Sequence, residues 1–139
     1  MNPIIRPAKD SDLIACERLL SVPELFFPDG KPWSKDWIAN YLDNDFFLVA
    51  ELDGEVVGCI IGESLKKQGS LIWLLSVDSG SRGLGIGAQL LKAYENNARN
   101  KGIAWIMLYS VLYDERTLKF YQKNNYLCGS KLTECLKYL

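Results

Sequence analysis

Helical spacing of apolar residues marks the first element that the sequence predicts. Apolar side chains recur through residues 13–20 at intervals that place them on one helix face, and Asp10 or Ser11 can cap this helix before Pro23 ends it. Residues 2–6 ahead of it form a short apolar segment, which is compatible with a strand at the edge of a sheet. The chain is therefore expected to begin with a strand followed by a helix.

Aromatic and turn-forming residues dominate the next segment, which reads E-L-F-F-P-D-G-K-P-W over residues 24–33. The prolines and the glycine stop a helix, while the aromatic side chains favour an ordered loop. Ser34 then caps a second short helix that reaches about residue 43. The loop is either a lid over a binding site or an apolar cluster under a long connection. The residues of this loop that are candidates for substrate contact are Glu24, Phe27, Asp29 and Trp33. The carboxylates of Glu24 and Asp29 would face a cationic substrate or are simply solvated.

Three apolar runs then predict an antiparallel meander. The runs at 46–52 and 55–65 are rich in β-branched residues, and the Asp-Gly pair between them is a strong hairpin signal. Two glycines inside the second run indicate a bulge or a close neighbour. A polar turn leads into the third run, 71–77.

Glycines stand where this third strand gives way to the amphipathic segment 88–100, in the run V-D-S-G-S-R-G-L-G-I-G of residues 77–87. Glycine permits positive φ and has no side chain, so successive N–H groups can converge on one anion. The start of the following helix and the charge of Arg82 add to this preference. We therefore expect a phosphate or pyrophosphate site, with a plain strand-to-helix turn as the alternative.

Two common nucleotide-binding motifs do not fit this run. A P-loop ends in Lys followed by Ser or Thr, and no such pair closes the run. The dinucleotide fingerprint spaces its glycines as G-x-G-x-x-G, whereas this run has G-x-G-x-G in a chain too short for two nucleotide-binding halves.

The chain beyond the glycines predicts a strand, helix and strand joined by a right-handed parallel crossover. Gly102 ends the helix, and I-A-W-I-M-L-Y at 103–109 follows as a buried strand. The glycine run therefore opens at the carboxyl end of strand 71–77, where open α/β sheets bind ligands. Asp114 then caps a short helix before a last strand at Tyr126.

Composition describes one soluble domain. The chain has 139 residues, 48% of them apolar and 24% charged, which is enough for a sizeable core without metals or disulfides. A formal net charge of −1 without a long basic block argues against a nucleic-acid binder. There is neither an apolar run of membrane-spanning length nor a signal-peptide pattern, so we expect a cytoplasmic protein that does not enter membranes.

Histidine is absent from the sequence, which limits the available chemistry. Ser-His-Asp and Cys-His devices and histidine metal sites are removed, and no metal is expected. The cysteines at 16, 59, 128 and 135 never form C-x-x-C and are expected to be buried free thiols. Any acid or base must be Tyr, Cys, Lys, Asp, Glu or water.

Two motifs in the second half of the chain carry a family resemblance. Arg82, Gly85 and Gly87 satisfy the pattern of Gln or Arg, two residues, Gly, one residue, then Gly or Ala. The run D-E-R-T-L-K-F-Y-Q-K-N-N-Y at 114–126 keeps the register of Asn, two residues, Ala, three residues and Tyr, with Asp114 in place of the Asn. Together these motifs resemble the GNAT superfamily of N-acetyltransferases, from the hairpin to the end of the chain.

This resemblance implies an α/β (α+β) fold in a single domain of residues 1–139, with acetyl-CoA as co-substrate. The expected sheet is mixed and mostly antiparallel, with about six to seven strands, a V-shaped splay that holds acetyl-CoA, and about four flanking helices. Backbone groups of Leu75 and Val77 would pair with the pantetheine arm, and Asp114, an acid where the family has Asn, would stand beside the cofactor. The residues whose N–H groups would hold the pyrophosphate are Arg82, Gly83, Leu84, Gly85, Ile86 and Gly87.

The resemblance also implies acetyl transfer to a primary amine by direct attack in a ternary complex, with Tyr121 as proton donor to the CoA sulfur. The general base is open, because strand 71–77 lacks the glutamate of many relatives and Tyr109 stands where ribosomal alanine acetyltransferases have one. Glu63 acting through water is one candidate, and Ser76, Tyr109 or no enzyme base are the others. Tyr109 is also a candidate acceptor contact.

Three functions stay open on the sequence. Mild acidity favours a small cationic amine as acceptor for an acetyltransferase. The alternatives are a module that senses acyl-CoA or docks a partner without turnover, and an enzyme that modifies a protein N-terminus or lysine. Homodimers are common in this family, and the near-zero net charge permits one.

Overall fold

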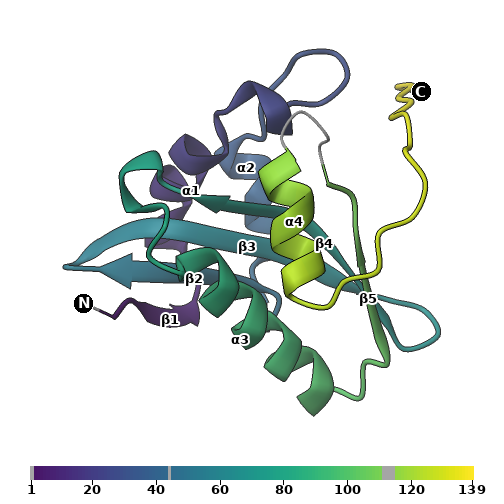
Figure 1. Cartoon of the computed structure of the whole chain (residues 1–139). Helices are drawn as coiled ribbons and strands as arrows, with labels where there is room; N and C mark the ends of the chain where they lie inside the picture. The colour runs from purple at the N-terminus through teal and green to yellow at the C-terminus, as the bar shows by residue number, and fades with distance from the viewer. Residues whose placement is uncertain (1, 44, 111–114) are drawn as a thin grey trace.

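A five-stranded mixed sheet forms the centre of the molecule (Figure 1). The computed structural model describes residues 2–43, 45–110 and 115–139. Its strands are β1 (Ile4–Pro7), β2 (Phe47–Leu52), β3 (Glu55–Leu65), β4 (Gly69–Val77) and β5 (Trp105–Leu108). They lie in chain order across the sheet, antiparallel from β1 to β4, while β5 runs parallel to β4.

Helices cover both faces of this sheet. The α-helices are α1 (Leu13–Leu20), α2 (Lys35–Ile38), α3 (Ile86–Asn100) and α4 (Glu115–Lys123), with 3-10 turns at Asp10–Asp12, Pro23–Leu25, Ala39–Tyr41 and Ser79–Ser81. Figure 1 shows α3 and α4 on the near face. The α1/α2 core includes Leu13, Cys16, Ile38, Val49, Ile61 and Leu74. The α3/α4 core includes Ile60, Ile72, Leu90, Leu91, Tyr94 and Tyr121.

Local sequence signals account for most of these elements. Asp53 and Gly54 have φ angles of 53° and 81°, as a tight two-residue hairpin turn requires, so the predicted hairpin is confirmed. The Ser34 hydroxyl accepts a hydrogen bond of 3.2 Å from the Trp37 N–H and caps α2. The apolar stripe of α3 is buried, and the positive φ of 75° at Gly102 ends that helix as predicted.

A bulge interrupts the pairing of β3 with β4. Ile61 pairs with Leu74 and Gly62 pairs with Ile72, which leaves Trp73 as an extra residue on β4. Gly62 fits there because it has no side chain; an added Cβ would collide with the Tyr94 hydroxyl and lie 2.5 Å from the Leu71 carbonyl oxygen. The bulge and close neighbour that the glycines of this strand indicated are therefore present.

The predicted splay lies between β4 and β5. These strands pair only from Gly69 with Trp105 to Ile72 with Leu108, and β5 then ends while β4 continues to Val77. The second half of β4 thus has no strand on that side within the described residues. This is the V-shaped opening that the family resemblance implies.

The sheet has five strands in the described chain, fewer than the six to seven that we expected. No strand forms at Tyr126, and residues 126–139 carry no regular structure. β5 is also not a buried strand, because its residues alternate between half-buried and exposed. The physical reason is that one face of β5 contacts the α3/α4 core, where Ile106 and Leu108 pack, while Trp105 and Met107 on the other face are exposed.

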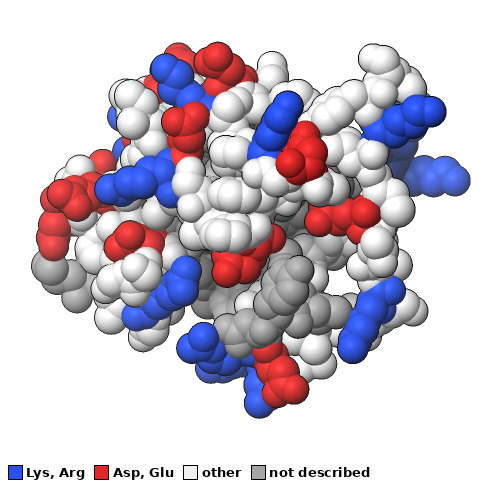
Figure 2. All heavy atoms as spheres, turned by 90° about the horizontal axis from the view of Figure 1, so that it is seen from above, with Lys and Arg blue, Asp and Glu red and all other residues white. Residues whose placement is uncertain are grey.

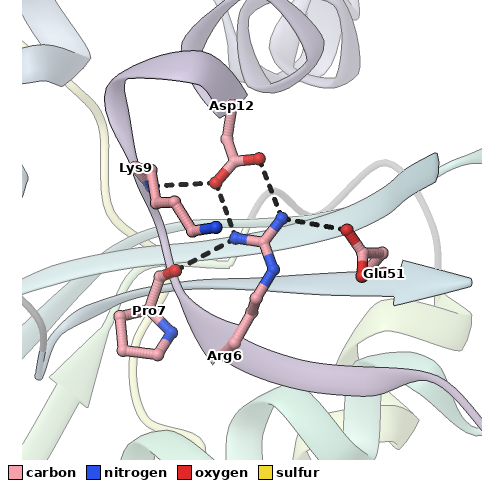
Figure 3. Close-up of polar contacts among 5 residues, drawn as sticks. All are labelled: Arg6, Pro7, Lys9, Asp12 and Glu51. Atoms are coloured by element: carbon pink, nitrogen blue, oxygen red, sulfur yellow. Dashed lines mark hydrogen bonds and ion pairs between the residues drawn. The ribbon is translucent and has the colours of Figure 1, made fainter. Parts of the chain in front are cut away.

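An ion-pair network fastens the N-terminal strand to the sheet (Figure 3). The Arg6 guanidinium donates to both Asp12 carboxylate oxygens, at 2.7 and 3.0 Å, and to Glu51 of β2 at 3.1 Å. Asp12 also accepts a hydrogen bond from the Lys9 N–H and is 5% exposed. The guanidinium holds the pKa of the Asp12 carboxyl below its ordinary value.

The expectation for the cysteines has a mixed outcome. All four cysteines are free, but only Cys16 and Cys59 are buried, whereas Cys128 and Cys135 lie exposed in the C-terminal segment. In the described part of the chain, none of the helices has the length and apolar character needed to cross a bilayer.

Candidate functional site

The glycine run forms a tight turn between β4 and α3. The 3-10 turn Ser79–Ser81 follows β4, and the Asp78 carboxylate accepts a backbone hydrogen bond from it at 3.2 Å. Gly83 and Gly85 then have φ angles of 80° and 77°, in the left-handed region that favours glycine. α3 begins at Ile86, whose side chain is 2% exposed and anchors the turn in the α3/α4 core.

Open space surrounds the two left-handed glycines. A Cβ atom added to Gly83 or Gly85 would have no other atom within 4 Å, and both residues are exposed. Gly85 has no side chain with which to cap α3, and first-turn N–H groups have no partner inside a helix. The turn therefore presents backbone donors and the positive end of a 15-residue helix to an anion.

Gly87 has a different role from the other two glycines. It lies inside α3 with a helical φ, so it does not free the backbone as Gly83 and Gly85 do. A Cβ at this position would lie 3.5 Å from the Phe120 ring and 3.8 Å from the Val77 side chain. These are ordinary van der Waals distances, so an alanine would also fit at this position between α3, α4 and β4.

Positive charge stands beside the turn. A cavity of about 160 Å³ lies between the end of α1 and the end of β4, and Arg18, Arg82 and Asp78 are among the residues that line it. The Arg82 Nε donates a 3.3 Å hydrogen bond to the Val77 carbonyl. Leu84 at the tip of the turn is 59% exposed.

The second half of β4, which has no strand beside it on the β5 side, leads directly into this turn. Leu75 and Val77 lie in it, and their side chains pack against the α3/α4 core. Backbone N–H and C=O groups require partners, so this edge suits an extended ligand chain with amide groups. The open edge of β4 and the glycine turn are therefore continuous in the chain.

Tyr121 lies on α4 and belongs to the α3/α4 core. Its side chain is 9% exposed, with its ring centroid 5.1 Å from that of Phe120 and 5.8 Å from that of Tyr126. Burial raises the pKa of the Tyr121 hydroxyl to about 12, so the phenol keeps its proton at neutral pH. A protonated hydroxyl is a proton or hydrogen-bond donor.

Glu63 and Trp73 lie on the opposite face of the sheet. The indole Nε1 of Trp73, the bulged residue, donates a 2.6 Å hydrogen bond to the Glu63 carboxylate. The Trp73 ring centroid is 6.2 Å from that of Trp33, which belongs to the α1/α2 core. Tyr121 therefore lies on one face of the sheet, and the Glu63 carboxylate with the Trp73 indole lies on the other.

Aromatic side chains gather around Trp33 on this second face. Trp33 is 6% exposed; its ring stacks on Phe27 at 4.7 Å and lies 6.3 Å from both Trp37 and Tyr41. We call Phe27, Trp33, Trp37, Tyr41 and Trp73 the Trp33 cluster. Sequence analysis selected only Phe27 and Trp33, although the spacing of Trp37 and Tyr41 on one helix side was a usable signal.

Comparison with known proteins identifies the family to which this site belongs. The sequence profile of the Acetyltransferase (GNAT) family matches residues 14–126, which includes the turn, the splay and Tyr121. The chain is a member of the GNAT acetyltransferase family.

One relative and two solved structures show what this chain is similar to. A stretch of 50 residues is 52% identical to an uncharacterized N-acetyltransferase of Methanocaldococcus jannaschii, and covers 36% of this chain but only 31% of that relative. Ard1 of Thermoplasma volcanium has a similar structure, with a TM-score of 0.83, 20% identity and coverage of 94% of this chain and 86% of Ard1. Naa50 of Arabidopsis thaliana, solved with the bisubstrate analogue CoA-Ac-MVNAL, has a TM-score of 0.72 at 24% identity, covering 89% and 82%.

The other expected site residues are dispersed in this GNAT fold. Asp29 accepts hydrogen bonds from the Lys31 N–H at 3.0 Å and from the Tyr138 hydroxyl at 2.8 Å, which lower the pKa of its carboxyl and tie the C-terminal segment to the loop. Glu24 lies exposed on the turn Pro23–Leu25. Tyr109 follows β5 and is 60% exposed. Asp114 lies outside the described residues.

Charge on the GNAT surface is mixed. On the face in Figure 2, lysine and arginine side chains are interspersed with aspartate and glutamate. This distribution agrees with a formal net charge of −1 from 16 basic and 17 acidic residues. A field of one sign therefore does not cover this face.

Proposed function

We propose that this protein transfers an acetyl group from acetyl-CoA to a primary amine by direct attack within a ternary complex. The observation that carries this proposal is the continuity of three features: the unpaired half of β4, the anion-binding turn after it, and the buried Tyr121 beside it. Membership of the GNAT family supports it.

Acetyl-CoA fits the chemistry of these groups. Its pyrophosphate would accept hydrogen bonds from the N–H groups of residues 82–87, with Arg82 supplying a full charge. The amides of its pantetheine arm would pair with backbone groups of Leu75 and Val77 along the unpaired edge. The thioester would then lie farther along β4, toward the bulge at Trp73.

The reaction follows from this placement. The acceptor ammonium loses a proton to solvent, and its nitrogen attacks the thioester carbonyl from the face that carries Glu63 and Trp73. A C–N bond forms, the C–S bond breaks, and the nitrogen loses its second proton to water as the amide forms. Tyr121 donates its proton to the departing sulfur and regains one from water, because a pKa of about 12 keeps it protonated beforehand.

A small cationic amine is our preferred acceptor, because Glu63 offers a carboxylate among aromatic rings beside the splay. Two other functions are the alternatives to this one. Modification of a peptide is favoured by the likeness to Naa50, which was solved with a peptide-bearing analogue. An acyl-CoA sensor without turnover would use the same turn.

The test combines binding and turnover. Calorimetry should give micromolar binding of acetyl-CoA, and thiol release should follow when one class of amine is added. Tyr121→Phe should keep acetyl-CoA affinity and lower kcat by about 100-fold or more, since it removes only the proton donor. Binding without thiol release for amines and peptides would establish the sensor, and release with peptides alone would establish the protein-modifying enzyme.

A further inference from the structure

Glu63 has surroundings that suit a bound cation better than a base. We propose that Glu63 and the exposed rings of the Trp33 cluster bind a second, non-reacting ammonium group of the acceptor, which makes the acceptor a diamine or polyamine. This inference rests on the proposed acetyl transfer and specifies its acceptor. Its observations are the Glu63–Trp73 hydrogen bond, the ring geometry and the place of both residues relative to the splay.

The carboxylate lacks a permanent cationic partner. No lysine or arginine of the described chain forms an ion pair with Glu63, and Trp73 donates its neutral indole N–H instead. That bond holds the carboxylate in one orientation and leaves its second oxygen to accept from a ligand. An ammonium group is the complementary ligand, because a bond between two charged groups is stronger than one between neutral groups.

The rings around the carboxylate are arranged to receive a cation with an alkyl chain. Trp33 is buried at the centre of the cluster. The ring centroids of Trp37 and Trp73 lie 6.3 and 6.2 Å from that of Trp33, and these two residues are 50% and 39% exposed. Tyr41 is the remaining ring of the cluster near Glu63. Burial together with the negative charge of Glu63 raises the pKa of the Tyr41 hydroxyl. Indole faces attract ammonium groups and cover methylene chains, so this surface matches both parts of a diamine.

The distance from Glu63 to the splay separates anchoring from chemistry. Glu63 lies on β3 and pairs with Leu71, whereas the splay opens on the far side of β4. Neighbouring strands are about 4.8 Å apart, so the Glu63 backbone lies about one and a half strand spacings, or roughly 7 Å, from the middle of the gap between β4 and β5. An extended diamine of the putrescine class fills that interval with one nitrogen at each end.

The experiment compares putrescine with butylamine, which has the same chain but one nitrogen. Wild-type protein saturated with CoA should bind putrescine in calorimetry more tightly than butylamine, and turnover should show the same preference in KM. Glu63→Gln should raise the KM for putrescine about 10-fold to 100-fold and leave the KM for butylamine and the pH profile of kcat unchanged. Trp73→Phe, which keeps a ring but loses the N–H donor, should have a smaller effect in the same direction.

Glu55→Gln is the matched control, because Glu55 is exposed at the other end of β3 and should leave both amines unaffected. Unchanged acetyl-CoA affinity in Glu63→Gln would show that the variant is folded. Equal affinity of the wild type for both amines overturns the inference, as does an equal loss of kcat for both with a displaced pH profile, which identifies Glu63 as the base. Putrescine binding at this site without any thiol release supports the subsite while the proposed transfer fails, so the two failures are distinguishable.

Discussion

Gly62→Ala tests whether the packing beneath the bulge sets the stability of this fold. A Cβ at this position would collide with the Tyr94 hydroxyl and would lie 2.7 Å from Tyr94 Cζ and 2.5 Å from the Leu71 carbonyl oxygen. Tyr94 is fully buried and cannot move outward without disturbing its neighbours. Its hydroxyl also hydrogen-bonds to Ser70 Oγ at 2.6 Å and to the Leu71 carbonyl at 3.3 Å.

The magnitude follows from these two costs. Forcing one extra carbon into a packed core costs about 1–3 kcal/mol. Displacing Tyr94 also breaks a buried hydroxyl hydrogen bond, which adds about 1–2 kcal/mol. The free energy of unfolding should therefore fall by about 2–5 kcal/mol, and for a domain of this size the Tm should drop by roughly 8–20 °C.

Thermal and urea unfolding followed by circular dichroism measure this change. Gly129→Ala is the control, because a Cβ there meets no atom within 4 Å, and its Tm should equal that of the wild type. Adding Tyr94→Phe to Gly62→Ala removes the colliding hydroxyl and should restore part of the Tm. A Tm of Gly62→Ala within about 2 °C of the wild type would refute the reasoning.

Three further predictions concern other parts of the fold. Asp12→Asn should lower the free energy of unfolding by about 2 kcal/mol near neutral pH, since it removes charge-assisted bonds to Arg6. Because the folded-state pKa of Asp12 is lowered, the wild type should lose this advantage over the variant as the pH falls from about 5. Urea unfolding of both proteins at pH 7 and pH 3 measures the difference. Gly85→Val, at φ 77°, should cost about 1–2 kcal/mol and abolish acetyl-CoA binding in calorimetry, and normal binding would contradict the assignment of the turn. Ser34→Ala should lower the Tm by a few degrees, equivalent to about 1 kcal/mol, through loss of the cap on α2, and an unchanged Tm would show that the cap is dispensable.

Turn chemistry explains why the hairpin, the glycine turn and the start of α2 could be predicted from sequence. Each depends on residues adjacent in the chain, such as Asp53 with Gly54, whose backbone preferences act locally. The two motifs likewise placed the pyrophosphate turn and Tyr121 without knowledge of the packing. The roles of the turn and of Tyr121 in binding and catalysis stay predictions.

Features that depend on partners distant in the chain were not predictable in the same way. The apolar residues of the C-terminal segment suggested a strand, but a strand requires a neighbour, and Leu127 and Leu132 lie exposed without one in the described structure. Trp73 joins Glu63 and Trp33 because a bulge changes the register of β4. The glycines of β3 indicated a bulge or a close neighbour, but not which residue of β4 it would displace. The Trp33 cluster was therefore only partly predicted from the sequence.

The short strands at the borders of the sheet have a consequence for solubility. β1 and β5 have four residues each, whereas the inner strands have six, eleven and nine. A short border offers few free N–H and C=O groups to another molecule, which limits aggregation through sheet extension. Because β5 ends at Leu108, the divergence that opens room beside β4 also keeps this border strand short.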